Sequence, residues 1–199
     1  MHLGLICPEL SGHLNPMTTL GRELARRGHR VTVVARLDAQ RKAGAAGLGF
    51  AAIAEDEFPL GATTRAWAEL GKMSGVLAVR CTAELLRRGA AAILRDAPAV
   101  LAREKVDALL VDQVAQAGGT VADVLGLPYV TVCNALAMNP DPDVPPGVTP
   151  WPYSSGPFGR VRNALGNALL RWLAAPIYCF GMIPLPSSVS TFGRITAWQ

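Results

Sequence analysis

Short apolar runs alternate with amphipathic helical segments along the first part of the chain, and this alternation restricts the fold more than any other feature. The run "HLGLIC" (2–7) ends at a proline-containing loop, which is typical of a buried strand. The segment 15–29 has helical spacing, and 30–36 is rich in β-branched residues. A short helix (38–49) and a third strand (50–54) follow. Strands and helices in this order, with short joints, predict a parallel sheet covered by helices on both faces.

The alternation continues after a long helical segment. Residues 62–104 are mostly helical in pattern, with a break expected at Pro98. A fourth strand (107–112), a helix (115–126) and a fifth strand (128–134) complete a doubly wound, Rossmann-like α/β domain. Seven prolines fall within residues 139–157, which predicts a long loop or extended arm. The predicted organisation is therefore a Rossmann-like domain (1–139), a proline-rich arm (140–158), and a helix with an irregular tail (159–199).

Composition narrows the class of protein. The net charge is +4, but the basic residues are scattered without a block of five, which favours a solvated surface over a nucleic-acid interface. The four cysteines form no C-x-x-C pair, and Cys7 and Cys133 lie in apolar strand-like runs. We therefore expect reduced, buried thiols in a cytoplasmic protein. The first apolar run is too short for a signal peptide.

Residues 172–193 contain no charged side chain and nearly reach the length of a membrane span. However, Pro176, Pro184 and Pro186 would interrupt a helix there, and the last third is polar. We expect a buried segment or a peripheral contact with the inner face of the membrane rather than a transmembrane helix.

Two ionisable residues are placed to meet at one edge of the predicted sheet. His13 lies in the loop after the first strand, and Asp112 ends the fourth. These two strands are usually neighbours in a doubly wound sheet, whose ligands bind beyond the carboxyl ends of the strands. A carboxylate on one imidazole nitrogen fixes the tautomer and leaves the other nitrogen to take a proton. The pair is a candidate general base.

Simpler interpretations of these residues stay open. His13 could cap the following helix, for which Asn15 and Pro16 suit the start, and Asp112 could cap the helix after its own strand. The loop has no G-x-G-x-x-G or P-loop pattern, and the chain has no G-x-S-x-G elbow, so nicotinamide, flavin and serine-hydrolase chemistry are disfavoured. His29, at a helix-to-strand joint, is expected to be structural, and His2 to be inert.

Several residues are candidates for an acceptor site. Trp151 and Tyr153 stand out because an extended arm has little core to pack against; ordinary packing is the alternative for every aromatic residue. Gly12, Asn15 and Asn134 lie in the loops after the first and fifth strands. The acceptor-site candidates are Gly12, Asn15, Trp67, Asn134, Trp151 and Tyr153, with Phe158 and Trp172 as further aromatic candidates.

The segment "SGHLNPMTTLGRELARRGHRVTVVAR" resembles the opening of nucleotide-sugar-dependent glycosyltransferases of the GT-B fold, family 1 type, in the group of zeaxanthin, macrolide and plant flavonoid glucosyltransferases. "DALLVDQVAQAGGTVADVLGLPYVTVCNA" resembles the same family's fourth strand, helix and fifth strand. The resemblance implies that His13 is the general base and that Asp112 orients it. It implies inverting transfer of a hexose to a hydroxyl of an apolar small molecule, with a nucleotide sugar as co-substrate and no metal or other cofactor.

The resemblance covers only the acceptor-side half of that family. The motif with which the family's second domain binds the nucleotide sugar is not present in the sequence. We therefore expect the donor to be bound by a missing C-terminal domain or a separate subunit, and the chain alone to show negligible turnover. The alternative function is a non-catalytic fragment that binds a hydrophobic ligand or a membrane surface.

Overall fold

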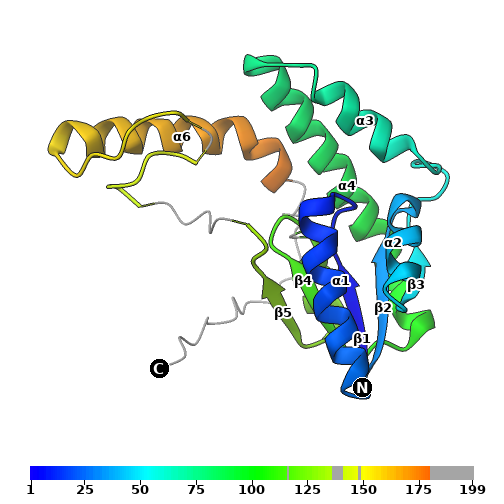
Figure 1. The fold of residues 1–199 in the computed structure, drawn as a ribbon. Helices are drawn as coiled ribbons and strands as arrows, with labels where there is room; N and C mark the ends of the chain where they lie inside the picture. Colours follow the sequence, from blue (N-terminus) through cyan, green and yellow to red (C-terminus); the bar gives the residue numbers. More distant parts are fainter. Residues whose placement is uncertain (116, 136–140, 148, 180–199) are drawn as a thin grey trace, which may run out of the picture.

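A five-stranded parallel sheet forms the centre of the protein. The computed structural model describes residues 1–115, 117–135, 141–147 and 149–179. The strands are β1 (His2–Ile6), β2 (Arg30–Ala35), β3 (Gly49–Ala52), β4 (Ala108–Asp112) and β5 (Tyr129–Val132). Their order in the sheet is β3-β2-β1-β4-β5, so β1 and β4 are neighbours (Figure 1). The doubly wound α/β fold predicted from the sequence is confirmed.

Helices cover both faces of the sheet. The helices of the described chain are α1 (Ser11–Arg26), the 3₁₀ turn η1 (Leu37–Ala39), α2 (Gln40–Ala45), α3 (Ala62–Leu70), α4 (Gly75–Glu104), α5 (Ala117–Leu125) and α6 (Pro157–Cys179). One apolar cluster joins α1 and α2 to the sheet, and a second joins α4 and α5 to its other face. Strand residues alternate between them, so that Leu5 faces α1 and Ile6 faces α4. Full burial of such a side chain contributes about 1.5–3 kcal/mol.

Two helix boundaries differ from the prediction, and both involve proline. Helix α1 begins at Ser11, before Pro16, because the Leu10 carbonyl accepts the first helical bonds from the N–H groups of His13 and Leu14. Pro16 removes only one bond near the exposed start of the helix. Helix α4 runs through Pro98, because packing of its buried residues onto the sheet outweighs the lost bond. The helical segment is interrupted instead between the end of α3 at Leu70 and the start of α4 at Gly75.

The cysteines only partly follow the prediction. Cys7 is buried, as expected, but Cys133 is exposed, and its thiol donates to Gln113 Oε1 at 2.8 Å. The expectation failed for Cys133 because β5 is an edge strand whose residues are mostly exposed. Burial raises the pKa of the Cys7 thiol well above its usual range, and the negative charges of Asp112 and Glu9 act in the same direction. Cys7 therefore stays neutral.

Helix α6 extends away from the sheet with the proline-rich segment along it (Figure 1). It reaches Cys179, and the tail 180–199, predicted to be irregular, lies outside the described residues. Three buried residues on its inner side are Gly159, Asn163 and Gly166. The Asn163 amide donates to the Pro142 carbonyl at 3.0 Å, which ties the segment to the helix. Within the described part of the chain, no helix is both long and apolar enough to cross a membrane.

Substituting Gly166 with alanine should loosen this attachment. A Cβ at Gly166 would lie 2.6 Å from the Trp151 ring and 2.9 Å from Pro146, so the segment must shift. We expect a local cost of about 1–3 kcal/mol and greater solvent exposure of Trp151. Tryptophan fluorescence should shift to the red and become easier to quench. Gly44→Ala is the matched control, since no atom lies within 4 Å of its Cβ. An unchanged emission spectrum for Gly166→Ala would contradict this packing.

Asp38, in the 3₁₀ turn η1, binds the backbone at the start of α3. Its carboxylate accepts from the Gly61 N–H at 2.5 Å, and from the Thr64 N–H and hydroxyl at 2.8 and 2.9 Å. Burial by itself would raise the pKa of Asp38, but these hydrogen bonds outweigh it and hold the pKa below its usual range. The resulting stabilisation is present above the unfolded-state pKa of about 3.9 and is lost as the pH falls through the lower folded-state value.

Asp38→Asn replaces one accepting oxygen with an amide NH₂ that cannot accept, so it should destabilise the protein by about 1–3 kcal/mol at neutral pH. The difference from the parent protein should begin to narrow below about pH 4, where Asp38 is protonated in the unfolded state, and should be smallest below its lower folded-state pKa, where both states are protonated. Denaturant unfolding at several pH values measures this, with the exposed Asp56→Asn as control. A difference that does not change with pH would argue against the assignment.

Candidate active site

The two ionisable residues singled out in the sequence are in contact. His13 Nδ1 lies 2.9 Å from Asp112 Oδ2, although 99 residues separate them. The pair forms because β1 and β4 are adjacent and Asp112 is the last residue of β4, next to the loop that leads from β1 into α1. His13 itself lies in the first turn of α1, not in the loop as predicted. Its side chain is 17% exposed, whereas that of Asp112 is fully buried.

Asp112 is held by two further donors. The Val114 N–H donates to Oδ1 at 2.9 Å, and the Asn134 amide donates to Oδ2 at 2.7 Å. Together with His13 they compensate the carboxylate for its burial, since a buried charge without partners is strongly unfavourable. Asn134, predicted as an acceptor-site residue, thus contacts Asp112. The carboxylate is fixed in place by β4, by the turn after it and by the loop after β5.

This geometry suits a proton acceptor. Asp112 occupies Nδ1 of the imidazole, so Nε2 is the nitrogen that can take a proton; it makes no hydrogen bond to a described residue. The ring is partly exposed, so a substrate hydroxyl can reach it. Chemically, the pair can act as a general base.

The structure places the other predicted acceptor residues at different distances from this pair. Gly12 and Asn15 are exposed in the first turns of α1, and Asn15 accepts from Lys42 Nζ at 3.0 Å. Trp67 is half-buried on α3. The Trp151 ring packs on Gly166 with the Arg162 guanidinium 5.3 Å from its centroid, so it serves the packing of α6. Tyr153 is 67% exposed in the same segment. No contact described in the structure joins these three aromatic residues to His13.

Sequence reasoning missed a buried ion pair beside the site. Glu9, in the loop after β1, accepts from Arg36 Nε at 2.7 Å and from Nη2 at 2.6 Å. The two side chains are 5% and 11% exposed. The Arg36 guanidinium also lies 4.7 Å from the Phe58 ring centroid. The pair fixes the loop that leads to His13. The sequence did carry a signal for this pair, because the acidic Glu9 follows β1 and the basic Arg36 follows the adjacent strand β2.

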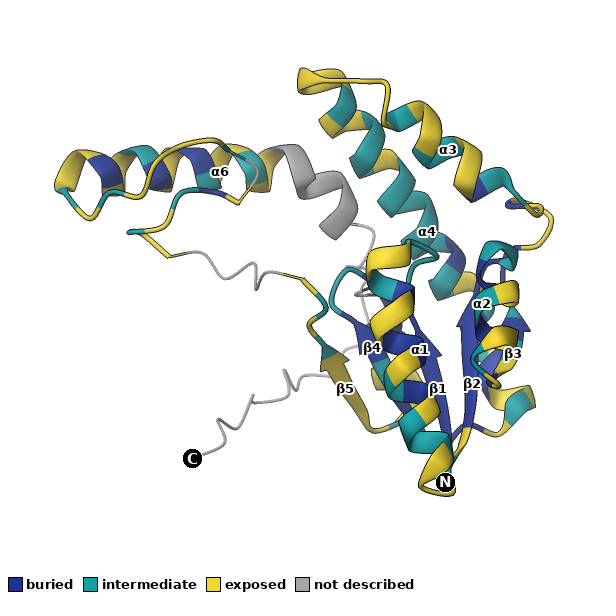
Figure 2. Cartoon of the chain, in the orientation of Figure 1, coloured by how far each residue is buried: buried dark blue, intermediate teal, exposed yellow. Residues whose placement is uncertain are grey.

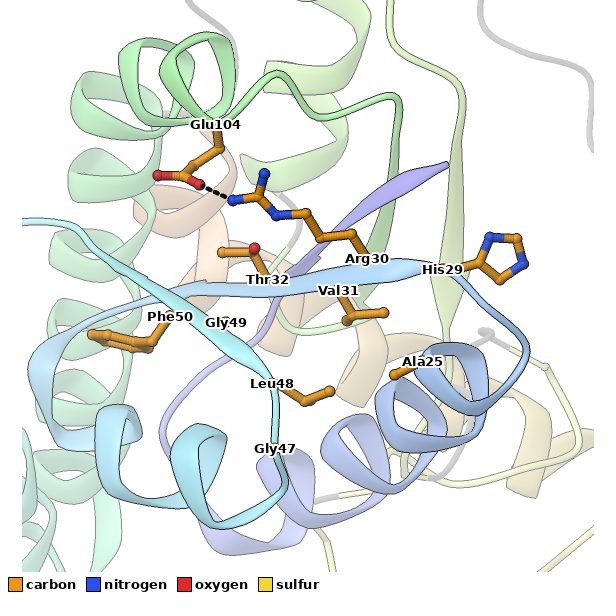
Figure 3. A pocket seen from close by; sticks show the side chains of 10 residues that line it. All are labelled: Ala25, His29, Arg30, Val31, Thr32, Gly47, Leu48, Gly49, Phe50 and Glu104. Atoms are coloured by element: carbon orange, nitrogen blue, oxygen red, sulfur yellow. Dashed lines mark hydrogen bonds and ion pairs between the residues drawn. The ribbon is translucent and has the colours of Figure 1, made fainter.

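The two remaining histidines lie away from this edge. His2 is buried in β1, where Nδ1 and Nε2 lie 2.8 Å from the Glu104 carbonyl and the Thr32 hydroxyl, so it links three elements rather than being inert. His29 lies at the joint between α1 and β2, as expected of a structural residue. It borders a cavity of about 300 Å³ at the amino ends of the strands, next to the Arg30–Glu104 ion pair (Figure 3).

A second cavity, of about 190 Å³, reaches Asp112 from the side of α5 and β5 and is lined by Gln113, Gly119, Tyr129 and Thr131 among others. Neither cavity includes His13. Among the residues that the structure describes, no group of three or more His, Cys, Asp or Glu side chains is arranged to hold a metal ion.

Comparison with known proteins gives consistent results. No protein-family model matches the chain. A zeaxanthin glucosyltransferase of Pantoea ananas is 32% identical over 172 residues, which are 86% of this chain and 40% of the relative. A zeaxanthin glucosyltransferase of Pseudescherichia vulneris is 31% identical over 159 residues, 77% of this chain and 36% of the relative. The chain thus spans about two fifths of the length of the curated relatives it matches.

Solved structures share the fold. The glycotransferase of kitacinnamycin superposes with a TM-score of 0.58 at 19% identity, over 89% of this chain and 38% of that one. Spinosyn rhamnosyltransferase, solved with thymidine diphosphate, superposes with a TM-score of 0.51 at 25% identity, over 87% of this chain and 41% of that one. A calicheamicin glycosyltransferase superposes with a TM-score of 0.51 at 26% identity, over 65% of this chain and 31% of that one. The chain is therefore similar in sequence to about two fifths of the zeaxanthin glucosyltransferases, and it shares its fold with glycosyltransferases of solved structure.

Proposed function

We propose that this chain is the acceptor-side, general-base part of an inverting glycosyltransferase that moves a hexose from a nucleotide sugar to a hydroxyl of an apolar small molecule. The observation that carries the proposal is the contact of His13 with the buried Asp112 at the carboxyl edge of the sheet. Ligands of open parallel sheets bind at this edge. The similarity to zeaxanthin glucosyltransferases supports the same chemistry.

In the proposed reaction His13 Nε2 takes the proton of the acceptor hydroxyl while its oxygen attacks the anomeric carbon. The bond from that carbon to the nucleoside diphosphate breaks on the opposite face, so the configuration inverts. The transition state has oxocarbenium character, as in other glycosyl chemistry. The Asp112 carboxylate stabilises the imidazolium that forms, and Asn134 with the Val114 N–H holds the carboxylate in position. These steps require no metal ion.

The donor part is proposed to come from the remainder of a longer protein or from a separate subunit. The matched relatives are more than twice as long as the region this chain covers. That part would bind the diphosphate and stabilise its departure, a contribution that is usually large. The acceptor is proposed to resemble zeaxanthin, a long apolar molecule with terminal hydroxyl groups, because the two curated relatives carry that name.

Binding measurements test the proposal directly. The purified chain is titrated with UDP-glucose, dTDP-glucose and apolar hydroxylated acceptors while tryptophan fluorescence is followed. We expect saturable acceptor binding and no binding of the nucleotide sugars. Tight nucleotide-sugar binding by the chain alone would show that the assignment to the acceptor side is wrong. Activity is tested in a chimaera in which this chain replaces the matching region of the Pantoea ananas relative.

A further inference from the structure

The apolar residues of α6 face the wrong way for a helix that packs on a protein core. Phe158, Val161, Leu165, Leu169 and Trp172 are separated by three or four positions, and together they form what we call the outer stripe of α6. At 100° per residue they fall within an arc of about 80°. All five are more than half exposed, with Phe158 at 90% and Trp172 at 71%. Helix α1 and the second half of α4, in contrast, bury apolar residues against the sheet.

The inner side of α6 explains this orientation. The residues that it buries against the proline-rich segment are small or polar: Gly159, Asn163 and Gly166. The Trp151 ring and Pro146 pack on Gly166, and Asn163 bonds to the Pro142 carbonyl. The proline-rich segment therefore occupies this side, and the outer stripe lies on another, exposed side of α6. Figure 2 shows that α6 has both buried and exposed positions along its length. A contiguous exposed apolar surface of this kind marks an interaction site.

The charges on α6 indicate the chemistry of the partner. Residues 157–179 contain Arg160, Arg162 and Arg171 but no aspartate or glutamate. Arg160 pairs with Asp143 and Arg162 donates to the Pro152 carbonyl, whereas Arg171 is exposed, about 80° outside the stripe at the helical repeat. Aromatic residues stand at both ends of the stripe. An apolar face with bulky aromatic side chains, on a helix whose only charged residues are arginines, is typical of helices that lie in the interface of a lipid bilayer and favour anionic lipids.

We propose that the outer stripe of α6 docks this chain on the surface of a bilayer that contains anionic lipids. The helix lies along the interface, its apolar side chains enter the boundary between headgroups and acyl chains, and the exposed Arg171 contacts lipid phosphates. This inference goes beyond the proposed function and depends on different residues. It also gives the molecule access to apolar acceptors dissolved in the membrane.

Co-sedimentation of the full chain with vesicles tests the docking. Vesicles of phosphatidylcholine alone are compared with vesicles that also contain phosphatidylglycerol. We expect binding to the mixed vesicles that weakens as salt is raised, because salt screens the arginines. Leu165→Gln/Leu169→Gln should lower the partition coefficient about tenfold or more. The control Leu60→Gln/Val124→Gln removes two apolar side chains of similar exposure elsewhere, and it should change binding less than about twofold.

Three results would overturn the proposal. The first is no binding of the parent chain to either vesicle, and the second is equal binding by the stripe variant. The third is that the parent chain sediments as a dimer without lipid, the stripe variant sediments as a monomer, and neither protein binds vesicles. In that case the stripe contacts a second copy of the chain. Circular dichroism confirms that the variants fold. His13→Ala should keep full vesicle binding, so failure of the docking and failure of the proposed function are distinguishable.

Discussion

His13→Ala is expected to reduce sugar transfer by the chimaera about 10²- to 10⁴-fold in kcat/KM, the usual contribution of a general base. The reason is that the pair of His13 and Asp112 presents Nε2 to the acceptor while the carboxylate stabilises the imidazolium. Removing the imidazole leaves the acceptor hydroxyl to lose its proton to water. Steady-state kinetics of the chimaera and of its His13→Ala variant measure the effect.

The chain offers a matched control for this substitution. His29→Ala changes the same residue type at the opposite edge of the sheet, and it should leave kcat/KM within about threefold because His29 touches neither the acceptor nor the base. Asp112→Asn should lose about as much activity as His13→Ala, since an amide cannot stabilise the imidazolium. Retention of most of the activity by His13→Ala in a folded chimaera would show that His13 is not the base.

Arg36→Ala is expected to produce the largest loss of stability among single substitutions near the site, about 3–5 kcal/mol. The substitution leaves the Glu9 carboxylate, whose side chain is 5% exposed, without its two guanidinium bonds. It also removes the contact of the guanidinium with the Phe58 ring. An uncompensated buried charge costs far more than the net contribution of an ion pair. Denaturant unfolding followed by circular dichroism gives the free energy.

A double-mutant cycle separates this effect from lost packing. Glu9→Gln/Arg36→Met removes both charges and keeps most of the side-chain volume, so it should destabilise less than Arg36→Ala. Arg30→Met is the exposed comparison. Its partner Glu104 lies at 3.2 Å, and the Arg30 side chain is 67% exposed, so the expected change is about 1 kcal/mol or less. Equal losses for Arg30→Met and Arg36→Ala would contradict the importance of burial.

Much of the fold followed from local pattern. The strand runs before Pro8, at 30–36 and at 107–112 were recognised because buried parallel strands are short and almost uniformly apolar. The contact of His13 with Asp112 was predictable because doubly wound topology brings the carboxyl ends of strands one and four together. The boundaries at Pro16 and Pro98 were wrong, because the cost of one lost helical bond is smaller than the gain from packing. The predicted domain limits and the roles of the site residues stay predictions.

The sequence by itself determined the order and type of the elements and the edge of the sheet where chemistry is possible, because both depend on periodicity and on the handedness of strand connections. Only the tertiary structure decided that Asn134 bonds to Asp112, that Glu9 meets Arg36 in a buried pair, and that the apolar stripe of α6 points outward. A helical repeat shows that a stripe exists but not what covers it. What covers a stripe depends on contacts between residues distant in the chain. Here the proline-rich segment packs on the side of α6 that carries small and polar residues, and the apolar stripe stays exposed.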